Sequence, residues 1–224
     1  MRFGRKKGLE DPATPDADPT AEGGVPAGPT ASGPIDVSEL DPAASYIDLG
    51  SLLVQPVEGL DLRLQVDEQS GTVLTVLLVA EEGVLELRAF ASARGGDLWT
   101  EARREIAADT ARRGGTATEQ EGSFGPELFC QVPVTGPNGE SLMQPSRVIG
   151  WTGPRWFLRA TLAGRPALDD EYAAPFEHAL RTLAVRRGNE AMPPGEALPL
   201  RMPPQAAGPG PEDGHDVEAG HPAE

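Results

Sequence analysis

Histidine, cysteine and lysine are scarce in this chain: its 224 residues include three histidines, one cysteine and two lysines. Only His178 and Cys130 represent the first two types between residues 45 and 204, where the hydrophobic patterning is clearest. Nucleophilic and metal-assisted chemistry draws heavily on these residue types. Their scarcity does not decide whether the protein is an enzyme, but it favours a protein that is not.

Long apolar runs are also missing. No segment of about 18 consecutive apolar residues occurs, so we expect no transmembrane helix. The first residues, MRFGRKK, carry the charge of a signal-peptide start, but GLEDPATPDADPT follows where an apolar segment would be needed. A single cysteine cannot form an internal disulfide, which agrees with a reducing compartment. The sequence therefore predicts a cytoplasmic protein.

Positive charge is too sparse to suggest a nucleic-acid binder. The formal net charge is −16, and the one cluster of basic residues is MRFGRKK. Phosphate recognition needs clustered Lys and Arg, so nucleic acid is an unlikely partner. Seventeen of the nineteen basic residues are arginines. We interpret this bias as the codon usage of a GC-rich genome, with bidentate anion recognition as the alternative.

Proline and glycine are concentrated at the two ends of the chain. Both ends are acidic and contain few apolar residues beyond alanine, so they cannot bury enough surface to offset the entropy of ordering. We expect residues 1–36 to be a disordered arm and residues 205–224 a disordered acidic tail. Residues 37–204 are long enough for a single domain with a sizeable core.

The first half of the expected domain alternates in the manner of β-strands. In LDLRLQV (60–66), every second residue is Leu or Val, which predicts a half-buried strand. Strands are also expected at 72–80 and 84–92, and short Gly-bearing turns between them favour an antiparallel meander. Residues 46–57 read as an extended lead-in, and 97–115 as a helix with Asp97 as its N-cap.

The second half repeats this logic. Strands are predicted at 115–123, 127–134, 146–152 and 154–164, and a final helix at 170–184. Residues 191–204 are expected to form a Pro-rich strap. On the last helix Phe176, Leu180 and Leu183 share one stripe, and His178 lies between its positions. The sequence thus predicts an α+β fold in the order βββαββββα, an antiparallel sheet of about seven strands with two main helices packed on it.

Several stretches carry a family resemblance: YIDLGSLLVQPVEGLDLRLQVDE (46–68), LRAFASARGGDLWTEARREIAAD (87–109), FGPEL (124–128), GPRWFLRA (153–160) and AMPPGEALPLRMP (191–203). They resemble the actinobacterial domain-of-unknown-function 3710 family, which has no assigned activity. More loosely, the second half looks like the Mog1/PsbP type of α-β-α sandwich, whose members are mostly binding or assembly factors. Such fold-level analogy implies a binding role without establishing it.

Catalytic and metal sites have few candidates. Cys130 and His178 form the one possible nucleophile–base pair, but Cys130 alternates with Leu128 and Val132, which predicts a buried structural thiol. Asp169, Asp170 and Glu171 are consecutive and suit a helix N-terminus better than a metal. His215 and His221 are too sparse to form a site. We assign no catalytic, cofactor-binding or metal-binding residue, and no cofactor.

Two further features have a plain and a functional interpretation. Arg94-Gly95-Gly96-Asp97 leads into a helix N-terminus that could hold an anion, but Asp97 would repel one and is better explained as a cap. Trp99, Trp151, Trp156 and Phe157 are most of the large aromatics. Trp156 and Phe157 point to opposite faces of one strand, and we prefer helices on both faces to an exposed aromatic partner surface.

These observations favour a non-enzymatic binding or assembly module for an unknown protein or small ligand. One alternative is an enzyme that uses Glu86, Arg88, Arg147 and Arg159 on an open sheet face. Another is a nucleic-acid-associated factor that docks through MRFGRKK.

Overall fold

The computed structural model describes residues 33–203, which form two sheets and two main helices. The larger sheet has seven antiparallel strands in the order β4-β5-β6-β10-β9-β8-β7. The α+β prediction and its strand count for this sheet are therefore confirmed. The strands are β4 (Asp61–Val66), β5 (Val73–Ala80), β6 (Gly83–Ala91), β7 (Thr116–Gly122), β8 (Gly125–Thr135), β9 (Ser141–Gly153) and β10 (Trp156–Gly164); the helices are α1 (Leu98–Arg112) and α2 (Asp170–Thr182).

Two meanders make up this sheet. Strands β4 to β6 form one and β7 to β10 the other, and β10 pairs with β6 to join them. The strand predicted at 146–152 was too short, because β9 begins at Ser141 instead of residue 146. The turn after Thr135 is tight enough for Thr135 to pair directly with Ser141, so the ladder starts at the Asn-Gly turn itself.

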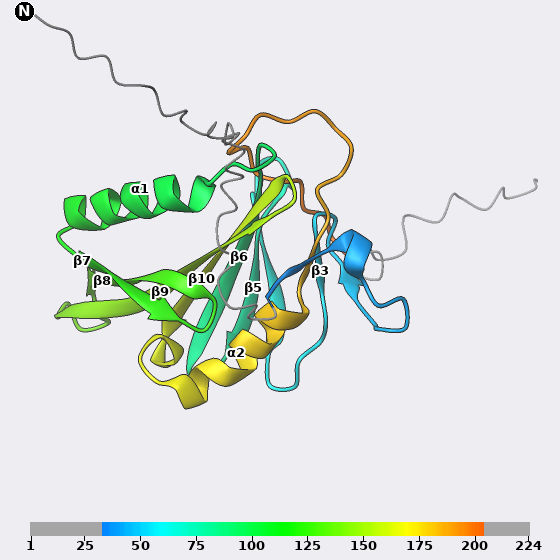
Figure 1. Cartoon of the computed structure of the whole chain (residues 1–224). Helices are drawn as coiled ribbons and strands as arrows, with labels where there is room; N and C mark the ends of the chain where they lie inside the picture. The colour runs from blue at the N-terminus through cyan, green and yellow to red at the C-terminus, as the bar shows by residue number, and fades with distance from the viewer. Residues whose placement is uncertain (1–32, 204–224) are drawn as a thin grey trace, which may run out of the picture.

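The two helices lie on opposite faces of the large sheet, as Figure 1 shows. Helix α1 packs against β7, β8 and β9. Successive side chains of the central strand β10 point to opposite faces of the sheet, so this strand contributes to the apolar clusters on both faces. Trp156 belongs to the main core with the α2 side chains, and Phe157 belongs to a smaller cluster with Trp99 of α1. Both are almost fully buried, at 1% and 3% exposed, which confirms that neither marks an open aromatic surface.

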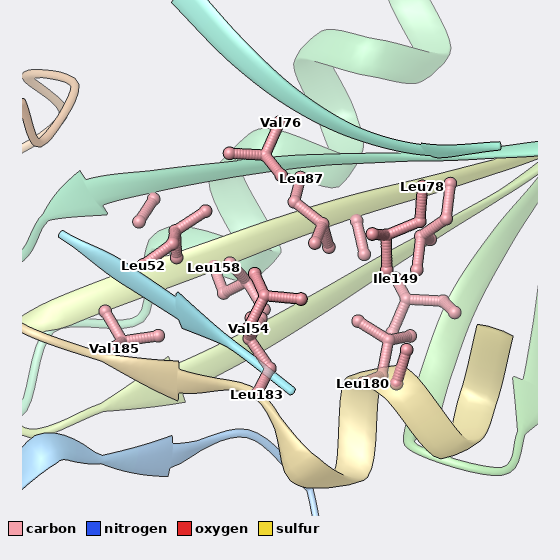
Figure 2. Packing of buried hydrophobic residues seen from close by; sticks show 14 of the residues in the cluster. Leu52, Val54, Val76, Leu78, Leu87, Ile149, Leu158, Leu180, Leu183 and Val185 are labelled. Carbon is pink, nitrogen blue, oxygen red and sulfur yellow. The ribbon is translucent and has the colours of Figure 1, made fainter. Parts of the chain in front are cut away.

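Helix α2 covers the main core. Phe176, Leu180 and Leu183 are 1%, 2% and 0% exposed, whereas His178 is exposed, so the predicted helix phase is confirmed. Figure 2 shows Leu180 and Leu183 facing Ile149 and Leu158 of the large sheet. The same view places Leu52 and Val54, from outside that sheet, over the same layer.

A second sheet that the sequence analysis did not foresee closes this core. It contains β1 (Ile35–Asp36), β2 (Ile47–Asp48), β3 (Leu52–Val54) and β11 (Ala184–Val185) in the order β1-β11-β3-β2. Its strands have two or three residues each; β2 and β3 form a local pair, whereas β11 pairs with β1 and β3 across more than a hundred positions. Such short segments show no readable period, so only the folded chain reveals the pairing. Ile35 and Asp36, assigned to the arm from the sequence, take part in it.

The strap, residues 191–203, runs beside β6 near the top of Figure 1 (orange). β5 and β6 pair only from Val76 to Ala80 and from Gly83 to Leu87. Beyond that point the backbones of Ala89 and Ala91 bond to strap residues 195–198. The strap therefore fills the gap where two neighbouring strands diverge.

Candidate functional site

Three alternate residue pairs (rungs) of the β6–β10 ladder present polar and aromatic side chains on the α1 face. Glu86 lies opposite Thr161, Arg88 opposite Arg159, and Phe90 opposite Phe157. Helix α1 sits over β7 to β9, so these rungs are at the border between the covered and the open part of the face. We refer to Arg88 and Arg159 as the arginine pair.

The arginine pair forms no ion pair among residues 33–203, although the charge of Glu86 acts on Arg159. Arg147, Arg165 and Arg186 each form an ion pair there, but neither member of the arginine pair does. The Nε of Arg88 is buried and unbonded within the same region. Two other arginines have an unbonded Nε, but they use terminal nitrogens to bond Glu119 and the carbonyl of Glu190. The donors of the arginine pair are therefore free for an external acceptor.

Phe90 holds the two guanidinium groups in place. Their Cζ atoms lie 5.8 Å (Arg88) and 5.6 Å (Arg159) from the centre of its ring. This is within reach of a cation–π attraction, which orients a guanidinium without neutralising it. Phe90 is in turn 6.2 Å from Phe157, which stacks on Trp99 at 6.0 Å. An aromatic row thus supports the charged pair.

Electrostatics make this arrangement unfavourable in the unliganded protein. Burial and the charge of Arg88 lower the pKa of Arg159, and Glu86 only partly opposes this shift. An arginine nevertheless stays protonated at neutral pH. Like charges directly opposite each other on paired strands are destabilising. An anion bound between the two guanidinium groups would remove this repulsion.

Two hollows meet at Arg159. The larger, about 620 Å³, lies between the second half of α1 and the sheet and includes Cys130, Ser146 and Thr161 in its lining. The smaller, about 300 Å³, has Phe90 and Phe157 as apolar lining and Pro194 of the strap at its border. Glu105 of α1 lines both hollows. Arg159 therefore borders a hollow of mixed polarity on one side and a partly aromatic hollow on the other, whereas Arg88 lines neither.

The cysteine and the histidine do not meet. Cys130 is 3% exposed in the α1-side cluster, and burial raises the pKa of its thiol, although a hydrogen bond with Thr110 opposes the shift. His178 is exposed on α2, on the other side of the sheet. The prediction of a buried Cys130 is confirmed, and the structure does not assemble a nucleophile–base pair from these two residues.

Arg147 does not lie on the open face, contrary to the enzyme alternative considered from the sequence. Its register partner Leu162 belongs to the main core, so alternation places it under α2. Its Nε and Nη2 donate to the two oxygens of Glu127 at 2.8 and 3.1 Å, and Nη2 also donates to Glu177 at 3.1 Å. Burial alone would lower the pKa of Arg147, but these carboxylates outweigh it and raise the pKa. This network is satisfied internally and is structural.

Both long helices begin with an aspartate cap. The Asp97 carboxylate accepts from the Thr100 amide at 3.0 Å, and hydrogen bonds from Thr100 hold the pKa of Asp97 below its usual value. Asp169 accepts from the amide of Glu171 at 3.1 Å. The cap interpretation of both segments is confirmed, and a carboxylate already fills the place an anion would take. MRFGRKK, His215 and His221 lie outside the described residues.

Sequence reasoning named Arg88, Arg159 and Glu86 but missed their pairing and the role of Phe90. Alternation shows that Arg88 and Phe90 share a face of one strand. It does not show that Arg159 and Phe157 sit directly across from them, because β6 and β10 are separated by some seventy residues and an intervening helix. The shared spacing in opposite order, Arg88 before Phe90 and Phe157 before Arg159, is the signal of an antiparallel pair that could have suggested it.

The fold is that of an α+β domain whose large antiparallel sheet carries a helix on each face. Residues 33–208 match the family described as Protein of unknown function (DUF3710), and the chain belongs to that family. The search of curated proteins found no match. None of the helices between residues 33 and 203 is long and apolar enough to cross a membrane.

Proposed function

We propose that this domain is a binding module that holds an anionic group of its ligand against Arg88 and Arg159. The observation that carries the proposal is the arginine pair itself. Two guanidinium groups face each other across a ladder without an ion pair among residues 33–203, at a cost in stability that a bound anion would reverse. Guanidinium groups bind carboxylate and phosphate oxygens through paired hydrogen bonds.

The wall of the site argues against a polyanion. Glu101, Glu105 and Asp109 lie along the flank of α1 that lines the two hollows. Arg112, Arg113 and Arg159 line the same hollows, so the wall is mixed in sign and does not offer the continuous positive field that a nucleic-acid backbone needs. The site is therefore suited to one anionic group and not to a polymer of phosphates.

Three further expectations from the sequence, on source, location and fold relationship, are part of this proposal. The family resemblance supports an actinobacterial source, the single buried cysteine agrees with a cytoplasmic location, and a sheet with helices on both faces agrees with a Mog1/PsbP-type relationship. Proteins of that type are mostly binding or assembly factors, which supports a module that binds without chemistry. The identity of the partner is the part that experiment must supply.

An NMR titration of the full chain with acetate and with inorganic phosphate, at constant ionic strength, tests the proposal. We expect amide shifts centred on residues 86–90 and 157–161, with dissociation constants of about 1–10 mM for such small probes. Arg88→Gln and Arg159→Gln should abolish the shifts. Each should leave the free energy of unfolding unchanged or raise it by up to about 0.5 kcal/mol, because the repulsion disappears.

Arg63→Gln is the matched control. Arg63 lies on the same face, is exposed, and pairs with Asp61 at 3.5 Å. Its replacement should leave the titration unchanged. Shifts that persist in both site variants, or that centre on Arg63, would refute the anion site.

A further inference from the structure

We propose, as an extension that depends on the anion site, that the ligand is an apolar carboxylic acid. Its carboxylate lies between Arg88 and Arg159, and its branched or aromatic group fills the 300 Å³ hollow on Phe90 and Phe157. The shared chemistry has two sources: a free small acid, or the carboxyl-terminal residue of a protein chain.

The spacing of the rungs sets the shape of this ligand. Arg88 and Phe90 are two residues apart on β6, as Arg159 and Phe157 are on β10, so the charged and aromatic rungs are separated by about 7 Å. A linker of roughly two or three bonds spans the gap between a carboxylate and a ring placed on these rungs. The ligand is therefore compact, with its apolar group close to its acid.

The smaller hollow is built for an apolar group. Its floor is the aromatic pair Phe90 and Phe157, and its walls include Leu98 and Ala102 of α1 and Pro194 of the strap. Phe157 is almost fully buried and stacks on Trp99, while Phe90, whose ring lies near both guanidinium groups, is only partly buried. A volume of about 300 Å³ lies at the lower end of the range for ligand sites and has room for about one ring.

The charges around the hollow select a carboxylate over a phosphate. Glu101 and Glu105 line the hollow together with Arg159, and Glu86 lies two residues from Arg88 on β6. These acids make the surroundings of the site partly negative, so a second negative charge on the ligand would be repelled. A single charge is held by the arginine pair without that penalty.

Calorimetric titration of the full chain separates the elements of this ligand. The probes are N-acetyl-L-phenylalanine, its carboxamide, and acetate. We expect N-acetyl-L-phenylalanine to bind at least tenfold more tightly than acetate, and the carboxamide to bind no better than acetate.

Pentapeptides ending in Phe, with free or amidated carboxyl ends, distinguish the two sources. A further tenfold gain for the free-ended peptide over N-acetyl-L-phenylalanine assigns the site to a protein terminus, and equal or weaker binding assigns it to a small acid.

Filling the hollow is the structural test. Ala102→Phe should remove the advantage of N-acetyl-L-phenylalanine and leave acetate binding intact. Ala111→Phe is the control, because Ala111 is exposed on the same helix and lines neither hollow. In the unaltered protein the methyl signals of Leu98 and Ala102 should shift with N-acetyl-L-phenylalanine and not with acetate, a readout that does not depend on the variant folding.

The outcomes separate the two proposals. If acetate binds through the arginine pair but N-acetyl-L-phenylalanine binds no more tightly, or the Leu98 and Ala102 methyls do not respond to it, the apolar acid is refuted and the anion site stands. If neither probe binds, both proposals fail.

Discussion

Arg147 and Arg159 show how the role of a residue depends on what faces it. Both lie on adjacent strands, and both are largely enclosed. Arg147 meets Glu127 and Glu177 and becomes part of a satisfied network. Arg159 meets Arg88 and has no ion-pair partner among residues 33–203. The first side chain belongs to an internal network, and the second is one of the two to which the proposed function assigns an anion.

The same contrast separates Leu180 from His178 on α2. Leu180 is 2% exposed in the main core, so Leu180→Ala should lower the free energy of unfolding by about 2–5 kcal/mol through lost burial and the cavity left behind. His178 is exposed, so His178→Ala should change it by less than about 0.5 kcal/mol. Urea denaturation measures both. A histidine change as damaging as the leucine change would contradict the packing of this helix.

At the scale of elements, a few polar side chains fasten the small sheet and the strap to the rest. Asp48 of β2 accepts hydrogen bonds from the Gly50 amide and from Arg186, and it forms an ion pair with Arg201 of the strap at 2.8 Å. Asp36 of β1 accepts from the indole of Trp156 at 2.8 Å. Short strands form few backbone hydrogen bonds, and these side-chain hydrogen bonds and ion pairs add to the attachment of the small sheet.

These bonds to Asp48 predict that the free energy of unfolding depends on pH. Burial alone would raise the pKa of Asp48, but bonds from Gly50, Arg186 and Arg201 outweigh it and lower the pKa below its usual value. A lowered pKa stabilises the fold above the unfolded value of about 3.9, and the contribution is lost as the pH falls through the folded value. Asp48→Asn should cost about 0.5–1 kcal/mol at pH 7 and close to nothing well below pH 3.9.

Urea titrations from pH 2.5 to pH 7 measure this difference. The exposed Asp61, which forms an ion pair with the likewise exposed Arg63 at 3.5 Å, is the control, and Asp61→Asn should have little effect at any pH in the series. A stability difference for Asp48→Asn that stays constant down to pH 2.5 would show that its carboxylate charge does not fasten the strap.

At the scale of the whole molecule, residues on the N-terminal side of the boundary drawn from the sequence at 37 contact the rest of the fold. Gly33 packs so closely on Trp151 that a Cβ there would overlap the indole ring. Ile35 pairs with Ala184, and Asp36 with Val185. The family match also begins at residue 33. Residues 33–36 thus contribute to the small sheet, while the boundaries 37 and 204 stay a prediction for the domain as a cooperative unit.

Two shortened chains test this. Residues 33–208 should unfold within about 1 kcal/mol of the full chain, because the acidic ends hold few apolar groups to bury. Residues 37–208 should lose a further 1–3 kcal/mol or so, because β1 and the Asp36–Trp156 hydrogen bond are removed. Equal stabilities of the two chains in urea would show that β1 contributes nothing.

The sequence by itself determined the elements of the large sheet and both helices, because alternation and helical spacing are local patterns that burial on one face imposes. It also determined that Cys130 and Leu180 face inward and His178 outward. Only the tertiary structure decided which strands pair, because register depends on partners distant in the chain. The small sheet, the placement of Arg147 on the core face and the meeting of Arg88 with Arg159 all follow from such long-range pairing. The candidate site is a product of register, and no single segment of the chain contains it.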